Sequence, residues 1–143
     1  MPLITLITNV QVEDSKGLNL ELSKFSSETL GMPHIIISVN VVQSDSLSFA
    51  GSFDPAFFLK VESLGDNISP EANVKYTEAY STFLKDKLSI PNDRGFIFFV
   101  DVGKTNIGFK GTTVAVLQEA LAKVTEAQGD RSETLIQNRI LSR

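Results

Sequence analysis

Pro2 is the residue of this 143-residue chain with the clearest potential for catalysis. A small residue after the initiator Met1 favours removal of that methionine, which would leave Pro2 with a free secondary amine. A free α-amino group has a pKa near ~7.7–8.0, and burial lowers this pKa because the charged form loses its hydration. Such an amine is neutral at physiological pH and is suited to act as a general base. Many proteins begin Met-Pro without any catalytic use, so the rest of the chain has to decide between the two interpretations.

Other reactive residue types are scarce in the chain. The absence of cysteine excludes disulfides, thiol nucleophiles and cysteine metal sites. With His34 as the lone histidine, the sequence disfavours a His-based metal site and a Ser-His-Asp triad. We interpret His34 as a solvated turn residue after Pro33. The sequence therefore predicts no metal and no cofactor.

Composition places the chain among ordinary globular domains. Hydrophobic residues make up 42% and charged residues 21% of the sequence, and the net charge is −4. No basic cluster is present, so nucleic acid is not an expected partner. No apolar run approaches the ~20 residues of a membrane span, and no charged segment precedes Leu3. We expect a cytoplasmic protein without a membrane span, for which any secretion would be leaderless.

The elements that must position Pro2 form a strand–helix–strand unit. Residues 2–10 are rich in Leu, Ile, Thr and Val, which predicts a mostly buried strand. Glu13-Asp14-Ser15 is typical of a helix start, and Gly31 of a helix end. One apolar helix face lies between them, formed by Leu18, Leu22 and Phe25. Residues 35–42 then predict a second, apolar strand.

The second half of the chain repeats this plan. Residues 56–64 and 95–100 predict strands, and Ser69-Pro70 between them is a strong helix start. The apolar face of that helix consists of Tyr76, Tyr80, Phe83, Leu84 and Leu88. Two such βαβ repeats predict an α+β fold with one four-stranded sheet and both helices on one face.

The predicted sheet has a second face that its own helices leave bare. Residues 35–42 and 96–100 are apolar on both sides, which is typical of a sheet covered on both faces. Other copies of the chain are the simplest cover, so we expect a symmetric homo-oligomer. The alternative is that residues 112–143 fold back over this face.

The C-terminal residues form a separate segment in our interpretation, with residues 1–113 as the main domain and 114–143 as a helical extension. Between Thr112-Thr113 and Gly129, apolar residues recur at helical spacing, namely Val114, Leu117, Leu121 and Val124. Residues 132–140 either add another helical turn or fray. A docked helix and a partly disordered appendage both remain open.

Several short motifs occur in an order that resembles one known family. They are Pro2-Leu3-Ile4, Thr8-Asn9-Val10, Phe49-Ala50-Gly51-Ser52, Asp54-Pro55, Val61-Glu62-Ser63-Leu64-Gly65, Pro91-Asn92-Asp93-Arg94 and Ile107-Gly108-Phe109-Lys110-Gly111-Thr112-Thr113. Together they resemble the macrophage migration inhibitory factor (MIF) and D-dopachrome tautomerase family of the tautomerase superfamily. Each motif alone is weak, but their common register from residue 2 to about residue 113 is specific.

This resemblance implies a fold, an assembly and a chemistry. The fold is that of a homotrimer in which three sheets form an inner barrel wrapped by helices, with active sites at the subunit boundaries. Pro2 would be the base that moves a proton between carbon and oxygen in keto–enol tautomerisation of a small enolisable carbonyl. Ser63 and Leu64 would lie beside it, with the Leu64 backbone N–H binding the carboxylate or oxygen of the substrate.

Three departures from the family pattern change the expected pocket. Met32 stands where the family usually has a lysine, and Phe96 and Phe98 of the partner subunit stand for a tyrosine and an asparagine. With Leu64 and Phe109 they would make the pocket apolar. One charge-assisted hydrogen bond contributes about 1.5–3 kcal/mol, so we expect weaker binding of anionic substrates.

Two functions from different classes follow from these observations. The first is a keto–enol tautomerase (an isomerase) of the phenylpyruvate or dopachrome type, weakened on anionic substrates. The alternative is a cytokine-type signalling protein that binds a protein receptor and has little or no activity; a purely structural trimer is a third option. The family's Cys-x-x-Cys is replaced by Ala56 and Leu59 at the cysteine positions, which excludes a thiol oxidoreductase. The sequence leaves open whether Met1 is removed.

Overall fold

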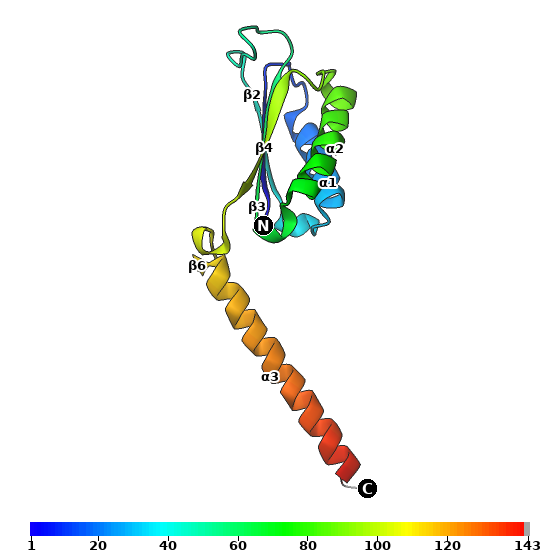
Figure 1. Ribbon diagram of the computed structural model, residues 1–143, viewed down its shortest axis with the longest axis vertical. Coiled ribbons are helices and arrows are strands. Elements are labelled where there is room, and N and C mark those ends of the chain that lie inside the picture. Colours follow the sequence, from blue (N-terminus) through cyan, green and yellow to red (C-terminus); the bar gives the residue numbers. More distant parts are fainter. Residues whose placement is uncertain (142–143) are drawn as a thin grey trace. The chain divides into compact units, whose positions relative to one another are not determined.

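The computed structural model describes the backbone of residues 1–141 and the side chains of residues 1–131 and 137–139. The chain folds into two compact units, residues 1–102 and residues 103–143. The first unit carries the sheet and two helices, and the second carries a short hairpin and a long helix (Figure 1).

The first unit is built on a four-stranded sheet with the strand order β2-β1-β3-β4. The strands are β1 (Leu3–Thr8), β2 (Ser38–Gln43), β3 (Phe57–Ser63) and β4 (Gly95–Asp101). The outer pairs β1–β2 and β3–β4 are parallel, while β1 and β3 are antiparallel in the centre. Each parallel pair is one of the two predicted βαβ repeats, so the α+β prediction is confirmed.

Both long helices of this unit cover the same face of the sheet (Figure 1). In α1 (Ser15–Leu30) the Asp14 side chain caps the first turn by accepting from the Gly17 N–H at 2.9 Å. In α2 (Pro70–Leu88) the Ser69 hydroxyl accepts from the Ala72 N–H at 3.1 Å, with proline at the first helical position. Helix α1 ends at Gly31, whose φ of 65° is a left-handed conformation that favours glycine.

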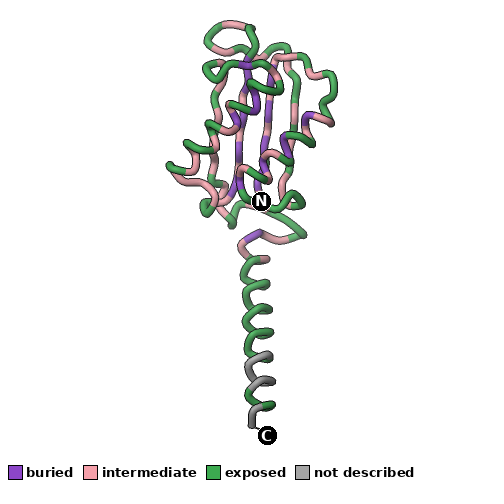
Figure 2. The backbone as a smooth tube through the Cα atoms, turned by 90° about the vertical axis from the view of Figure 1, so that its right-hand side faces the viewer, coloured by how far each residue is buried: buried purple, intermediate pink, exposed green. Residues whose placement is uncertain are grey.

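The core lies between this sheet face and the two helices, where the buried segments run in Figure 2. Its fully enclosed members come from alternate strand positions and from the apolar helix faces, and include Ile4, Leu6, Leu22, Leu59, Val61, Tyr80 and Leu84. The Tyr80 hydroxyl donates to the buried Ser26 Oγ at 2.8 Å. Burial of this phenol raises the pKa of Tyr80 to about 12, although the Ser26 hydrogen bond partly opposes the rise.

The opposite face of the sheet carries no helix of this unit. On β4 it presents Phe96 and Phe98, so the prediction of a two-sided apolar strand is right there. On β2 the prediction is right only in part, because Ser38 and Asn40 occupy exposed positions beside the exposed Val42. The predicted strand over residues 35–42 also begins too early, since residues 34–36 form a short 3-10 helix, η1 (His34–Ile36), in which Ile35 is 93% exposed.

The second unit begins with the short helix η3 (Lys104–Asn106) and a hairpin of β5 (Gly108–Phe109) and β6 (Thr112–Thr113). The hairpin turns at Lys110 and Gly111, both with positive φ, which suits the right-handed twist of two-residue hairpins. Helix α3 (Val114–Leu141) follows directly and confirms the extra C-terminal helix. It continues through Gly129, where the sequence pattern ends it, because a glycine inside a helix costs only about 1 kcal/mol relative to alanine. The last two residues of the predicted extension, 142 and 143, lie outside the described residues.

Candidate active site

Pro2 lies at the start of β1 and is fully buried. Its carbonyl oxygen accepts a hydrogen bond from the Ser38 N–H at 3.0 Å, which ties it to the first residue of β2. On the other side, the antiparallel register pairs Leu3 with Glu62, so its continuation places Pro2 opposite Ser63. Burial also lowers the pKa of the α-amino group of Met1, the residue before Pro2. The N-terminal end of β1 is therefore a poorly hydrated place for a cationic amine.

Ser63 is the polar group that faces this position. Its side chain is 1% exposed, and its Oγ has no hydrogen-bond partner in the described part of the chain. Residues directly opposite in an antiparallel pair have Cβ atoms about 4.5–5.5 Å apart. A buried hydroxyl without a partner costs about 1–3 kcal/mol. The Ser63 hydroxyl is therefore an unsatisfied group next to Pro2. The Pro2 nitrogen would become able to form hydrogen bonds if Met1 were removed.

Asp101 is a neighbouring acid that our sequence reasoning missed. It is the last residue of β4 and pairs in register with Ser63 of β3. A side chain at Gly65 would place its Cβ 2.6 Å from Asp101 Oδ2, so the carboxylate lies close against the backbone after Leu64. The signal was available, because parallel strands ending in Ser63 and Asp101 bring both residues to one edge of the sheet. Pro2, Ser63 and Asp101 lie on three neighbouring strands at the same end.

Two further predicted residues lie in segments that adjoin these strands. Met32 follows the Gly31 cap of α1 and precedes β2, whose first residue is bonded to Pro2. Its side chain is half-buried and packs against the core, while its carbonyl accepts from the Ser27 hydroxyl at 2.6 Å. Leu64 comes directly after Ser63 and is also half-buried. The structure therefore brings Pro2, Ser63 and Leu64 together, whereas Met32 lies in the segment that leads from α1 to β2.

The structure does not bring Phe96 and Phe98 to this region within one chain. Their rings are 63% and 48% exposed on the face that carries no helices. In the register of the sheet, Phe98 lies level with Thr5 and Phe96 level with Ile7. At about 3.4 Å per residue, these levels are roughly 10 and 17 Å along the strand from Pro2. A pocket that combines them with Pro2 needs a second copy of the chain.

The loop before β3 holds Phe96 in place. Arg94 donates to the carbonyl oxygens of Phe49 and Asp54 at 3.1 and 3.0 Å, and its guanidinium lies 5.2 Å from the centre of the Phe49 ring. The Phe49 ring meets the Phe96 ring edge-on at a centroid distance of 5.2 Å. Phe96 is therefore exposed but not loosely placed, as expected of a surface prepared for contact.

Phe109 lies in the second unit, on strand β5. It is 44% exposed, and Lys110 Nζ lies 5.6 Å from the centre of its ring. Its neighbourhood thus includes a cation as well as an aromatic ring.

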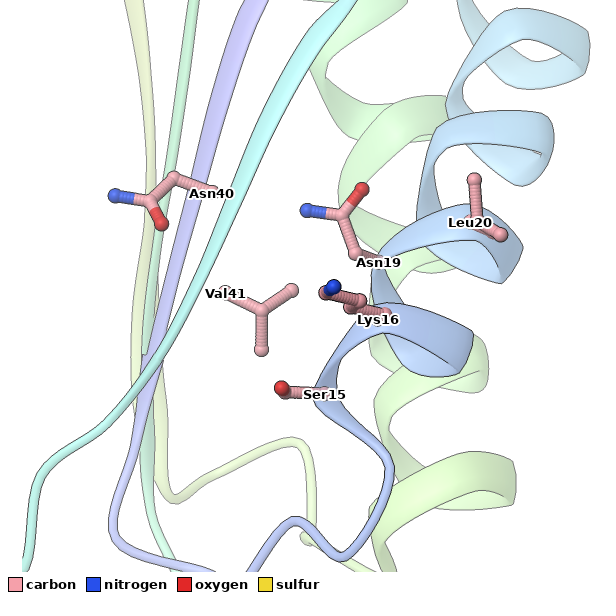
Figure 3. Close-up of a pocket in the computed structure, with 6 residues that line it drawn as sticks. All are labelled: Ser15, Lys16, Asn19, Leu20, Asn40 and Val41. Atoms are coloured by element: carbon pink, nitrogen blue, oxygen red, sulfur yellow. The ribbon is translucent and has the colours of Figure 1, made fainter.

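A hollow of the described surface lies away from these residues. One cavity of about 380 Å³ lies between the start of α1 and β2 and is lined by Ser15, Lys16, Asn19, Leu20, Asn40 and Val41. In Figure 3 the Val41 side chain points toward α1, whereas Asn40 points away from it. Asn19 is already engaged, because its amide donates to the Val39 carbonyl at 2.8 Å. None of the predicted site residues lines this cavity.

The remaining reactive groups in the described residues do not form a metal site, since no cluster of three His, Asp or Glu side chains suited to a metal ion is found there. His34 is exposed as predicted, and its Nε2 is 2.5 Å from the Ser23 Oγ, in a hydrogen bond that anchors the turn to α1. No helix in the described part of the chain is long and apolar enough to cross a membrane.

Comparison with known proteins settles the family. The family model described as Macrophage migration inhibitory factor (MIF) matches residues 1–115. The chain belongs to the MIF family. The match spans the whole sheet and the hairpin of the second unit and stops at the first residues of α3.

Relatives and solved structures agree with this MIF-family assignment. The chain is 33% identical to the macrophage migration inhibitory factor of Meriones unguiculatus over 116 residues, which is 80% of this chain and 100% of that protein. It is 32% identical to a Brugia malayi homolog over 114 residues, covering 79% of this chain and 98% of that protein. The solved MIF structure from Trichinella spiralis matches with a TM-score of 0.72 and 31% identity, over 78% of this chain and 98% of that one. A Prochlorococcus marinus homologue also matches with a TM-score of 0.72, at 28% identity and the same coverage.

Proposed function

We propose that this MIF-family protein is a keto–enol tautomerase in which Pro2, released by removal of Met1, acts as the base. One observation carries the proposal: Pro2 is fully buried directly before β1, opposite a buried Ser63 hydroxyl that has no hydrogen-bond partner among the described residues. Burial lowers the pKa of a secondary amine and keeps it neutral near pH 7. The lowered pKa of the Met1 α-amino group supports this effect one residue earlier.

In the proposed reaction, Pro2 moves a proton from one atom of the substrate to another, so the composition of the substrate does not change. The neutral Pro2 nitrogen takes the hydroxyl proton of the enol, and the resulting ammonium returns a proton to the adjacent carbon as the carbonyl forms. The Ser63 hydroxyl accepts a hydrogen bond from the protonated amine, and the Leu64 backbone N–H binds an oxygen of the substrate. No metal or redox group takes part in this transfer.

The substrate class follows from the charges around Pro2. Met32 brings no cation, and the Asp101 carboxylate lies two strands away, about 10 Å at 4.8 Å per strand spacing. An anionic substrate would lack a charged partner there, and losing one charge-assisted hydrogen bond of about 1.5–3 kcal/mol weakens binding roughly ten- to a hundredfold. We therefore propose uncharged, aromatic enolisable carbonyls as the preferred substrates.

The proposed pocket also needs a homotrimer. Phe96 and Phe98 lie on the open face and away from Pro2, so these rings would reach the base of a neighbouring copy. Covering this face removes exposed aromatic surface from water, which stabilises the assembly. Light scattering should give a mass three times the chain mass of 15.6 kDa. A monomer would contradict a pocket shared between subunits.

The experiment that tests the base uses the enol-to-keto conversion of an arylpyruvate and of its uncharged ester, followed by ultraviolet absorbance. Intact mass first establishes that Met1 has been removed. We expect a measurable rate on the ester that is lost when an alanine is inserted between Met1 and Pro2, because the nitrogen of Pro2 is then an amide. Pro2→Gly should lower the rate as well. An unchanged rate in both variants would contradict catalysis by Pro2.

A second candidate function is a binding or signalling protein of the same fold. It is favoured by Met32, an uncharged side chain that packs against the core at the position where a lysine was expected. Met32→Lys separates the two functions, with Met32→Leu as the control for repacking. A strong gain on the arylpyruvate with lysine only would show an intact catalytic site that lacks its anion partner. No activity in any variant, with the trimer retained, would favour the binding protein.

Ser63 has a testable part in this mechanism as a positioning residue. Because its hydroxyl stabilises the protonated amine, Ser63→Ala should lower the pKa of Pro2 and shift the acid limb of the kcat/KM profile to lower pH. Ser63→Thr keeps the hydroxyl and should restore the profile. A profile that stays in place while the activity falls would reduce Ser63 to a packing role.

A further inference from the structure

Helix α3 carries an apolar stripe whose side chains are exposed from residue 118 onward in the described part of the helix. Within the second unit, only its first turn is covered: Val114 is buried and its N–H donates to the Ile107 carbonyl at 2.9 Å. Every side chain from residue 118 to residue 131 is exposed, including Leu121 at 66% and Val124 at 53%. Helices in proteins gain most of their stability from the packing of an amphipathic face. This part of α3 therefore lacks the partner that such a helix needs.

The spacing of the apolar residues fits a coiled coil. Val114, Leu117, Leu121 and Val124, here called the α3 seam, follow each other at intervals of three, four and three residues. This is the alternation of positions a and d in a seven-residue repeat, which keeps the stripe facing a second helix of the same kind. The α3 seam spans about two repeats, up to Gln128 and Arg131 at the next two seam positions.

The charged residues of α3 lie away from the α3 seam. Between residues 114 and 130 all the charged residues fall at the outer positions c and f, namely Glu119, Lys123, Glu126 and Asp130. The flanking positions e and g hold only uncharged residues, which are Gln118, Ala120, Thr125 and Ala127. A charged partner helix would find no opposite charge at positions e and g of α3. A second α3 would meet no like charge at these positions.

We propose that α3 is a self-association element, and that its α3 seam packs against the α3 seam of another copy of this chain. This surface is self-complementary. The α3 seam is apolar, positions e and g beside it hold uncharged residues, and between residues 114 and 130 charged residues occupy only the outer positions c and f. From Leu117 onward, the α3 seam lies beyond residue 115, where the match to the MIF family ends. The inference is independent of the proposed catalysis by Pro2, because none of the site residues lies on α3.

Disulfide trapping tests this contact cleanly because the chain contains no cysteine. In the full-length protein, Leu121→Cys places one thiol in the α3 seam, and Lys123→Cys places one at an outer position of the same helix. Thiols held together at a seam experience a local concentration in the mM range. Under mild oxidation we therefore expect Leu121→Cys to form a covalent dimer at least about tenfold faster than Lys123→Cys at micromolar protein concentration.

A second substitution guards against fortuitous cross-linking. Adding Leu117→Glu to the Leu121→Cys protein puts a charge into the α3 seam and should abolish the covalent dimer, whereas adding Glu119→Gln should not. Equal cross-linking of Leu121→Cys and Lys123→Cys would overturn the proposal. So would failure of Leu121→Cys to cross-link, whether its thiol reacts freely with a maleimide, as in an unpaired helix, or is shielded by the rest of its own chain.

Discussion

The two faces of the sheet in residues 1–102 are made by the same strands but differ in how far their side chains are buried. On the face covered by α1 and α2, Ile4, Leu6 and Leu59 are wholly buried. On the other face, Leu3, Phe96 and Phe98 are 39%, 63% and 48% exposed. One chain completes the first face by itself and leaves the second face unfinished.

This difference divides the candidate site as well. Pro2 and Ser63 are buried in a single chain, so the proposed base is positioned by the fold of one subunit. The aromatic rings expected in the same pocket lie on the unfinished face, so they depend on assembly. The base and the walls of the pocket therefore respond to different kinds of substitution.

The sharpest test of the comparison uses two leucines of β1. Leu6→Ala should lower the free energy of unfolding by about 2–5 kcal/mol, because it opens a cavity in a closed core. Leu3→Ala removes the same atoms from the open face and should cost less than Leu6→Ala, since Leu3 is 39% exposed in the single chain. Urea denaturation followed by circular dichroism measures both. Equal losses would show that the open face is packed as densely as the helix-covered face.

A pH titration tests the closed face through Tyr80. Its pKa is raised to about 12 in the folded protein against 10.0 for an ordinary tyrosine, so the folded state holds the proton longer. This stabilisation is fully present below pH 10 and is lost as the pH rises toward 12, by up to about 3 kcal/mol at 1.36 kcal/mol per pH unit. Tyr80→Phe should remove this part of the alkaline loss of stability. Wild-type and Tyr80→Phe curves that fall in parallel between pH 9 and 12 would contradict it.

The smallest expected effect concerns the open face. There Lys60 Nζ lies 3.3 Å from Glu62 Oε1, and the two side chains are 39% and 25% exposed. An ion pair with this access to water contributes below about 1 kcal/mol, so Lys60→Gln should change the free energy of unfolding by no more than that. Glu62→Gln is the matched control. A loss beyond about 3 kcal/mol would show that neighbouring copies seal the pair from water.

Several features of the fold were predictable because their causes are local. The caps at Asp14 and Ser69, the Gly31 stop and the spacing of the helix faces depend on residues within one or two turns. The polar side of β2 was not foreseen, although Ser38 and Asn40 stand in the sequence. Whether these two side chains are exposed depends on which strand lies beside β2 in the sheet. Likewise, Asp101 became part of the candidate site only through its register with Ser63.

The sequence alone determined two βαβ repeats, a chain without thiols or a histidine cluster, a family-like order of motifs and a proline behind the initiator methionine. These properties follow from composition and from spacing along the chain. Only the tertiary structure decided that Pro2 is buried opposite a Ser63 hydroxyl without a partner among the described residues, that Phe96 and Phe98 face the other way, and that Leu121 and Val124 of the α3 seam are exposed. Strand register and the face of a sheet are relations between distant segments, so they exist only after the chain has folded.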